Sequence, residues 1–315
     1  PLIKRHTITS IFFGGGTPTQ CLEAVKVILK YITAKEITVE ANPEDLSIDN
    51  LKEMFDLGVN RLSIGIQTFD NILLKKLGRL HTKQQSFDAV INAYKLGFSN
   101  ISIDLMYEIP FLSFKSWKET ISNAVSLPIT HLSLYNLIFE EKTRFKRREK
   151  LLKPHLPHEE KTSQMLNYAL KTFKNAGLAR YELSAFCKNN QISYHNIGYW
   201  THRSYLGLGP SACSFIDKVR FQNECNIKKY IDQIKKKTLP ISFKESLSPI
   251  RSLHEKIAIG LRVLNGIQIE KWPLETIKVL NKLKNIGLLA LDRNRIKLTK
   301  KGLMFYDSVA EEIII

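Results

Sequence analysis

The sequence predicts an α/β fold built on a parallel sheet, with a smaller helical module at the C-terminal end. Over the first 137 residues, short apolar runs alternate with amphipathic stretches, and glycine or proline ends most of them. After that point the chain becomes charged and is broken by prolines. Alternation of apolar strands with helices is typical of a parallel sheet covered by helices. The spacing suits a barrel or part-barrel as well as a doubly wound sheet.

Five apolar runs are the candidate strands of this sheet. The first, TITSIFFG, leads directly into a glycine-rich turn, and the second, EITVEANP, ends at Pro43. Short runs rich in Ile, Val and Phe that are bounded by turn residues are typical of buried strands. The predicted strands cover residues 7–14, 36–43, 60–68, 100–110 and 130–137.

Amphipathic stretches follow four of these strands. Their apolar residues recur three and four positions apart, which is the spacing of one helix face. Gly58 and Gly97 end two of them, and glycine commonly follows a helix C-terminus. The predicted helices cover residues 20–34, 47–58, 84–97 and 113–127.

The pattern changes after residue 137. The segment EEKTRFKRREKLLKPHLPHEE (140–160) predicts a charged loop or linker over the functional site, and residues 160–177 predict another helix. Residues 180–215 are expected to be irregular and are rich in aromatics, His and Gly. From about residue 245, two helical patterns, a hairpin pattern over 288–302 and a closing helix predict a winged-helix-like module.

Composition narrows the class of protein. The chain has 315 residues, 43% of them hydrophobic, which is ample for a large core. No run of about 18 apolar residues occurs, so we expect no membrane span. The cysteines Cys21, Cys187, Cys213 and Cys225 form no CxxC pair, and we expect them to be reduced, mostly buried thiols of a cytoplasmic protein.

The formal net charge of +17 has two interpretations. Lysine is spread along the chain, with a local maximum at residues 140–153. A nucleic-acid-binding protein is one interpretation, which the winged-helix-like module would suit. The other is a lysine-rich, solvated surface that also favours anionic small ligands. We favour the second, because the chain has no basic, aromatic-studded strand of the RNA-binding type.

Polar residues lie at or near the ends of four predicted strands. These residues are Glu40, Gln67, Asp104 and Asn136. Functional groups of parallel barrels gather at the carboxyl ends of the strands. Together with the glycine turn that follows the first strand, these residues predict a shared pocket.

The turn GGGTP begins with Gly14, Gly15 and Gly16, followed by Thr17. Glycines after a strand let a ligand approach the backbone, and the next helix offers N–H groups to anions. The spacing is neither GxGxxG nor a P-loop. A ligand that bears a carboxylate or ammonium group would suit the turn. The structural alternative is a tight connection between strand and helix.

The segment at 194–215 gathers rings and imidazoles. It contains His195, Asn196, Tyr199, Trp200, His202 and Tyr205. Such a set suits a flat conjugated ligand whose metal is bound by a ring nitrogen. A packed aromatic corner with a hydrogen-bonded histidine is the alternative, and the residues alone favour it. In LGRLHT, Arg79 and His81 are further candidates, and an arginine near the pocket can pair with a carboxylate.

Taken in order, these segments resemble the radical S-adenosylmethionine proteins of the oxygen-independent coproporphyrinogen oxidase group. Within that group, EANP and HNIGYW look most like the heme chaperone branch. The resemblance covers nearly the whole chain, and the order of the motifs makes it specific. The motifs are FFGGGTPT, EANPEDL, GVNRLSIGIQTFD, LGRLHT, IDLMYEIP, HLSLYNL, YELSAFC, HNIGYW, YLGLGPSA and LTKKGL.

The resemblance implies a partial (β/α)6 TIM-like barrel with a C-terminal helical, winged-helix-like domain. Because the chain offers five strands, we expect the first βα unit to precede Pro1. The barrel core would cover residues 1–137, and the completion of the barrel with the aromatic and glycine-rich segment would cover 138–240. The C-terminal domain would cover residues 241–315.

The resemblance also implies two ligand sites. His195 would be the heme iron ligand, and Tyr199 and Trp200 would pack against the heme ring. S-adenosylmethionine would lie with its methionine part along the glycine turn. Its implied contacts are Gly14, Gly15, Gly16, Thr17, Glu40, Gln67, Arg79 and Asp104, with backbone contacts around Ile138 and Cys213.

One feature departs from the family pattern. Such proteins hold a [4Fe–4S] cluster with CxxxCxxC, which this sequence lacks, and its four cysteines have the wrong spacing to replace it. In the family this motif lies upstream of GGGTP, so we expect it to precede Pro1. A natural protein that has lost its cluster is the alternative. As it stands, the chain is expected to bind no cluster and to perform no radical chemistry.

The function implied by the resemblance is that of a cytoplasmic heme chaperone. It would bind heme and S-adenosylmethionine, and a cluster when the cysteine motif is present, and would pass heme to an acceptor protein. An electron donor such as a flavodoxin-like protein would be a further partner, and we expect no nucleic acid. One alternative is oxidative decarboxylation of coproporphyrinogen III to protoporphyrinogen IX. A remote alternative is a non-catalytic nucleic-acid-binding module.

Overall fold

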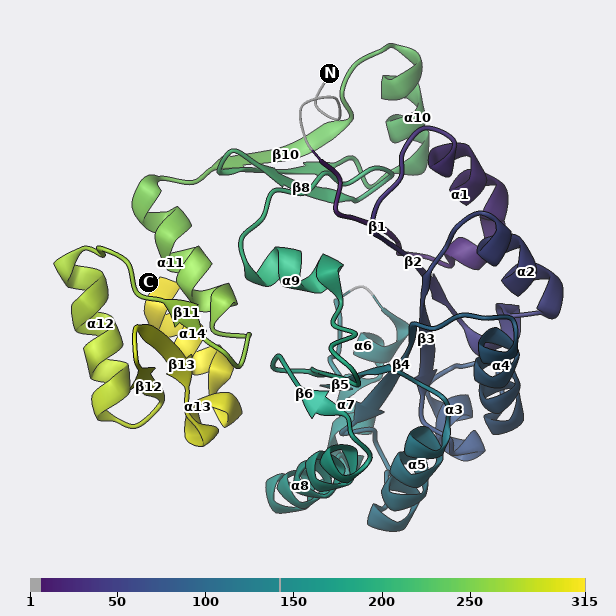
Figure 1. Ribbon diagram of the computed structural model, residues 1–315, viewed down its shortest axis with the longest axis horizontal. Coiled ribbons are helices and arrows are strands. Elements are labelled where there is room, and N and C mark those ends of the chain that lie inside the picture. The colour runs from purple at the N-terminus through teal and green to yellow at the C-terminus, as the bar shows by residue number, and fades with distance from the viewer. Residues whose placement is uncertain (1–6, 142, 315) are drawn as a thin grey trace. The chain divides into compact units, whose positions relative to one another are not determined.

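The computed structural model describes residues 7–141 and 143–314 (Figure 1). The backbone divides into two compact units, and the chain passes from the first to the second between His195 and Asn196. Both the parallel sheet and the helical C-terminal module that the sequence predicts are present. The boundaries predicted at residues 137 and 240 stay a prediction.

The first unit contains a seven-stranded sheet with the order β1-β2-β3-β4-β5-β7-β6. Strands β1 to β5 are parallel, whereas β7 is antiparallel to both β5 and β6. Because β1 to β5 follow one another without reversal, the order is that of a part-barrel rather than a doubly wound sheet. In chain order the strands are β1 Ser10–Phe13, β2 Glu36–Ala41, β3 Arg61–Gln67, β4 Ile101–Tyr107, β5 His131–Asn136, β6 Ala179–Arg180 and β7 Ala185–Cys187.

Helices connect the parallel strands and lie along one face of the sheet (Figure 1). Local capping fixes their starts: Ser47, Thr82 and Ser113 each accept a backbone N–H of the first helical turn. The α-helices of this unit are α1 Leu22–Leu29, α2 Ile48–Asp56, α3 Asn71–Lys76, α4 Lys83–Lys95, α5 Phe114–Ser126, α6 Arg144–Arg147, α7 Glu149–Leu152 and α8 Glu159–Asn175. Short 3₁₀ turns lie at Pro18–Cys21, Pro43–Asp45 and Lys153–His155.

Side chains alternate between the two faces of the parallel strands. The face toward the helices is apolar and forms the main core, with residues such as Val39, Leu62 and Ile103 fully buried. The opposite face, called the polar face below, carries mostly polar and charged groups. On strands β2 to β5 these are Glu36, Thr38, Glu40, Arg61, Ser63, Ser102, Asp104, His131, Ser133 and Tyr135.

The second unit contains two small sheets. Strands β8 Cys213–Ile216, β9 Val219–Asn223 and β10 Ile241–Ser246 form an antiparallel sheet. The predicted order of two helices, hairpin and closing helices follows. Its elements are α11 Pro249–Gly260, β11 Ile267–Gln268, α12 Leu274–Asn285, β12 Leu289–Asp292, β13 Arg295–Leu298, α13 Lys300–Met304 and α14 Tyr306–Ile314.

Two expectations about local structure are wrong. The charged segment after residue 140 forms α6 and α7, because Thr143 caps α6 and Lys146 pairs with Glu141 and Glu149. Residues 180–215 contain β7, β8 and the helix α9 Tyr194–Trp200. The helices α3 and α10 Ile227–Lys235 were not expected, and α3 begins where the Asp70 carboxylate accepts two backbone N–H groups.

Among the described residues, no helix is long and apolar enough to cross a membrane.

The core of the first unit gives a stability prediction. Trp117 on α5 is fully buried, and its Nε1–H donates to the carbonyl oxygen of Met165 on α8 at 2.8 Å. Trp117→Ala leaves a large cavity and should lower the free energy of unfolding by about 3–5 kcal/mol, measured by urea denaturation. Tyr94→Ala on α4 is the control, since Tyr94 is exposed. A loss at Trp117 no larger than that at Tyr94 would contradict the packing described.

Candidate functional site

The glycine turn after β1 has bare backbone. Gly15 and Gly16 have φ angles of +75° and +56°, and no atom lies within 4 Å of a Cβ built on either residue. The Gly15 N–H donates to Glu40 Oε2 at 3.2 Å. A Cβ on Gly14 would stand 2.9 Å from that same oxygen and 2.7 Å from Cε1 of Phe12. The turn is therefore packed against Glu40 on one side and open on the other.

Glu40 and Asp104 lie on the polar face close enough to affect each other electrostatically. The Ser63 hydroxyl donates to Asp104 Oδ2 at 3.4 Å, and Ser133 also hydrogen-bonds this carboxyl. Burial raises the pKa of both carboxyl groups, and Asp104 raises that of Glu40 further. Arg61 opposes both shifts. The pair is thus an acidic site held beside a buried cation.

Gln67 and Arg79 lie together over Gly65. A Cβ on Gly65 would stand 3.0 Å from Gln67 Nε2 and 3.8 Å from Arg79 Nη1. Gln67 ends β3 with a φ of +68°, and its Oε1 accepts the Tyr135 hydroxyl at 2.7 Å. Burial raises the pKa of Tyr135 to about 12, and Asp104 contributes to this rise.

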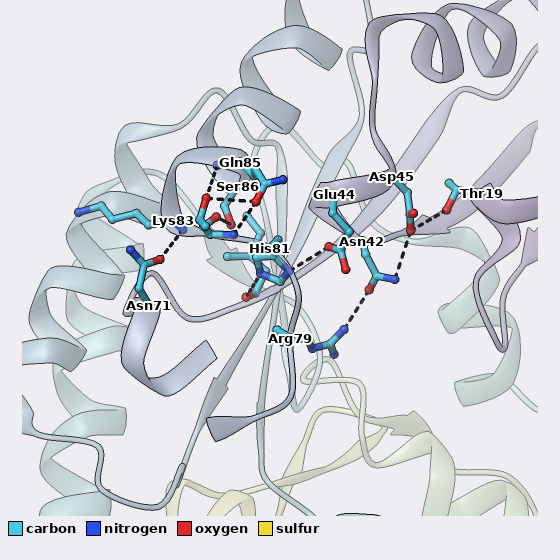
Figure 2. Close-up of polar contacts among 12 residues, drawn as sticks. Thr19, Asn42, Glu44, Asp45, Asn71, Arg79, His81, Lys83, Gln85 and Ser86 are labelled. Atoms are coloured by element: carbon cyan, nitrogen blue, oxygen red, sulfur yellow. Dashed lines mark hydrogen bonds and ion pairs between the residues drawn. The ribbon is translucent and has the colours of Figure 1, made fainter. Parts of the chain in front are cut away.

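Two contacts join the loop after β2 to the loop after α3 (Figure 2). Arg79 Nη1 donates to Asn42 Oδ1 at 2.9 Å. Two residues further along both loops, His81 Nδ1 lies 3.1 Å from Glu44 Oε2. His81 Nε2 lies 3.2 Å from the Ile66 carbonyl oxygen, which anchors the histidine to β3. Burial lowers the pKa of His81, while Glu44 opposes that shift. His81 therefore joins the two loops.

The structure thus brings four predicted residues together: Glu40, Gln67, Arg79 and Asp104. Asn136 does not join them, because it is exposed at the end of β5 and out of phase with Tyr135. Sequence reasoning missed Tyr135, although the alternation along LSLYN would have placed it on the same face as His131. Thr17 precedes the 3₁₀ turn Pro18–Cys21, with no capping bond from its side chain. Ile138 is 65% exposed just beyond β5.

His195 lies near the glycine turn. Its Nδ1 is 3.2 Å from Ser10 Oγ, and its ring stacks on Phe12 with centroids 4.7 Å apart and planes at 20°. The same Phe12 ring is the one that a Cβ on Gly14 would strike. One aromatic side chain of β1 therefore contacts both the glycine turn and the predicted heme ligand.

Tyr199, Trp200 and Cys213 belong to the second unit. Tyr199 packs edge-on against Tyr205 with ring centroids 4.7 Å apart, and Cys213 is exposed at the start of β8. Their predicted roles stay predictions.

A cavity of about 210 Å³ lies within the second unit. Tyr199, Trp200 and Arg220 line it, together with His202 and Glu255. His202 Nε2 lies 3.5 Å from Glu255 Oε1, and this carboxylate also pairs with Arg220. His202 therefore lies beside the Arg220–Glu255 ion pair of this unit.

The cysteines form no centre of their own. Cys21 is exposed and Cys187 buried in the first unit, and Cys213 and Cys225 are exposed in the second, so the expectation that most of these thiols are buried is wrong. Across residues 7–141 and 143–314, no three His, Cys, Asp or Glu side chains are grouped to hold a metal ion. The residues described do not fit an iron–sulfur cluster.

The raised pKa of Asp104 gives a pH-dependent prediction. Because this pKa is higher in the folded protein than in the unfolded chain, the folded state binds more protons between the two values. Stability therefore falls as the pH rises through that interval. An asparagine at position 104 cannot ionise, so Asp104→Asn removes this fall in stability. The Tm of the variant at pH 7 should exceed that of the parent, and the difference in Tm should shrink toward about pH 4.

Thermal unfolding between about pH 4 and pH 8 measures this difference. Asp88→Asn on α4 is the control, because Asp88 is exposed. A variant Asp104→Asn that is less stable than the parent at pH 7 would show that hydrogen bonds from Ser63 and Ser133 outweigh the cost of burial.

Comparison with known proteins agrees with the fold described above. The Radical SAM superfamily model matches residues 2–124, and the HemN C-terminal domain model matches residues 247–305. Coproporphyrinogen III oxidase (HemN) from Escherichia coli has the same fold, with a TM-score of 0.83 over 98% of this chain and 78% of that chain. At 20% sequence identity, this similarity concerns the fold alone.

Curated relatives are more similar in sequence. The heme chaperone HemW of Lactococcus lactis is 34% identical, over 98% of this chain and 85% of that protein. HemW of Bacillus subtilis is also 34% identical, over 96% of this chain and 84% of that protein. The chain therefore belongs to the HemW family of the radical SAM superfamily.

Proposed function

We propose that this protein is a heme chaperone that binds heme and S-adenosylmethionine and transfers heme to an acceptor protein. Its relatives named heme chaperone HemW match nearly the whole chain. The observation that carries the proposal is the setting of His195, which begins the HNIGYW segment. Its ring is held between Ser10 and Phe12 at the edge of the glycine turn.

His195 is proposed as the heme iron ligand. When Nδ1 donates to Ser10 Oγ, the lone pair lies on Nε2, the nitrogen that commonly binds metals. Stacking on Phe12 limits rotation of the ring. Tyr199 and Trp200 are proposed to pack against the heme. Heme itself would be the cargo, passed on to an acceptor protein in the cytoplasm.

The glycine turn and the polar face are proposed as the S-adenosylmethionine site. Gly14, Gly15, Gly16 and Thr17 provide the bare backbone that a methionine moiety needs. Glu40 and Asp104 offer carboxylates, and Arg79 and Gln67 offer donors to the same space. Backbone groups around Ile138 and Cys213 are proposed to complete it. When bound, the cofactor supplies a sulfonium centre flanked by an ammonium and a carboxylate group.

Membership of the superfamily implies a [4Fe–4S] cluster as well. The described residues do not supply its ligands, so no step proposed here runs through it. An electron donor such as a flavodoxin-like protein would serve that cluster. Oxidation of coproporphyrinogen III is the alternative activity, but the solved oxidase shares only the fold with this chain.

Heme titration tests the proposed ligand. The parent should bind heme with a shift of the Soret band, and His195→Ala should lose that shift because the imidazole is removed. His155→Ala is the matched control, since His155 also stacks on a phenylalanine, Phe111, with ring centroids 4.1 Å apart. Identical spectra for His195→Ala and the parent would remove His195 as the ligand.

Equilibrium dialysis with labelled S-adenosylmethionine tests the second site. In Gly14→Ala the new methyl group must displace Glu40 or Phe12. Displacement of Glu40 removes a charged contact with the cofactor, so the affinity for S-adenosylmethionine should fall by roughly tenfold. Gly58→Ala is the control for backbone strain, because Gly58 has a φ of +85°, which strains an alanine, and lies between α2 and β3 rather than in the turn. Equal affinities of Gly14→Ala and Gly58→Ala would place the cofactor elsewhere.

A further inference from the structure

We propose that Glu36 and Tyr181 are positioning residues that hold the start of α9 and thereby set His195 in place for heme. The inference rests on the proposed function, in which His195 binds the heme iron. It concerns a group of buried polar side chains on the sheet, at positions that the sequence analysis did not single out.

Three consecutive backbone N–H groups at the start of α9 donate to these two side chains. Glu36 Oε2 accepts the Tyr194 N–H at 2.9 Å, and Oε1 accepts the His195 N–H at 2.8 Å. The Tyr181 hydroxyl oxygen accepts the Ser193 N–H at 3.2 Å. The first N–H groups of a helix have no acceptor within the helix, so these bonds fix where α9 begins. His195 is thereby held through its own backbone.

A second set of contacts orients the Tyr181 hydroxyl. Arg61 Nη2 lies 3.3 Å from His131 Nδ1, and Ser102 Oγ lies 2.8 Å from the same nitrogen. A guanidinium can only donate, so Nδ1 is the acceptor and the proton of the neutral ring is on Nε2. That Nε2–H donates to the Tyr181 oxygen at 2.9 Å. Burial and Arg61 both lower the pKa of His131, in keeping with a neutral ring.

The charges of this group compensate each other. Glu36 is 3% exposed and Arg61 is 2% exposed, and the two attract each other. Burying such a pair costs desolvation that an apolar pair would not incur. Compared with an apolar residue, Glu36 provides two charge-assisted hydrogen-bond acceptors, and both accept backbone N–H groups of α9. The buried polar side chains are therefore connected by hydrogen bonds to the peptide segment that carries His195.

The ring of His195 is fixed by separate contacts with Ser10 and Phe12. Backbone and ring are thus held from two neighbouring strands, β1 and β2. Loss of either backbone anchor should let α9 shift at its first turn, and the imidazole should then spend less time in the position that binds iron.

The test compares heme binding by the whole chain carrying Glu36→Gln or Tyr181→Phe. Glu36→Gln loses the charge and one acceptor, and should weaken heme binding by about tenfold with partial loss of the Soret shift. Tyr181→Phe should weaken it by about threefold, because one neutral hydrogen bond is lost. Amide hydrogen exchange of residues 193–195 in the heme-free protein should become faster in both variants.

Asp70→Asn is the matched control. Asp70 Oδ1 also accepts two backbone N–H groups at a helix start, those of Ile72 at 2.8 Å and Leu73 at 3.2 Å. This helix is α3, so the variant should keep the Soret shift and the exchange rates of residues 193–195, even where its stability falls. Glu36→Asp keeps the charge on a shorter side chain and should restore part of the Soret shift lost in Glu36→Gln.

The outcomes separate the inference from the proposed function. If Glu36→Gln and Tyr181→Phe bind heme as the parent does, while His195→Ala loses the Soret shift, the positioning role is overturned and the ligand stands. If Asp70→Asn loses the shift as well, the effect is one of general stability and the inference also fails. If His195→Ala keeps the shift, the proposed ligand falls and the positioning role falls with it.

Discussion

Buried charge on the polar face of the sheet is the constraint on which the rest of the first unit depends. The opposite face is apolar and packs on the helices, so charged side chains can gather only on this side. Arg61 lies among Glu36, Glu40 and Asp104 and acts electrostatically on all three. One buried cation thus compensates both the acidic pair beside the glycine turn and the carboxylate that holds α9. The two predicted ligand sites share this charge.

Much of the fold was predictable because its signals are local. Apolar runs bounded by glycine or proline predicted β1 to β5, and helical spacing that ends at a glycine predicted helices such as α4. The helix α9 has no such signal. Its first N–H groups are satisfied by Glu36, about 158 residues earlier in the chain, so only the folded sheet shows where α9 begins.

The candidate site was predictable to the extent that it follows the ends of strands. Glu40, Gln67 and Asp104 were predicted to share a pocket, and the structure brings them together. The same rule failed for Asn136, because the side chain on the polar face is that of Tyr135. The left-handed backbone of Gln67 and the shift in register just before it are tertiary features that the sequence does not display. They bring the Gln67 amide back over Gly65.

The arrangement around β1 shows why the two ligand sites have to be considered together. Phe12 stacks on His195 and its ring edge contacts Gly14, and Glu40 holds the next residue of the turn through the Gly15 N–H. The glycine turn and the proposed heme ligand, His195, therefore share a contact in the single side chain of Phe12.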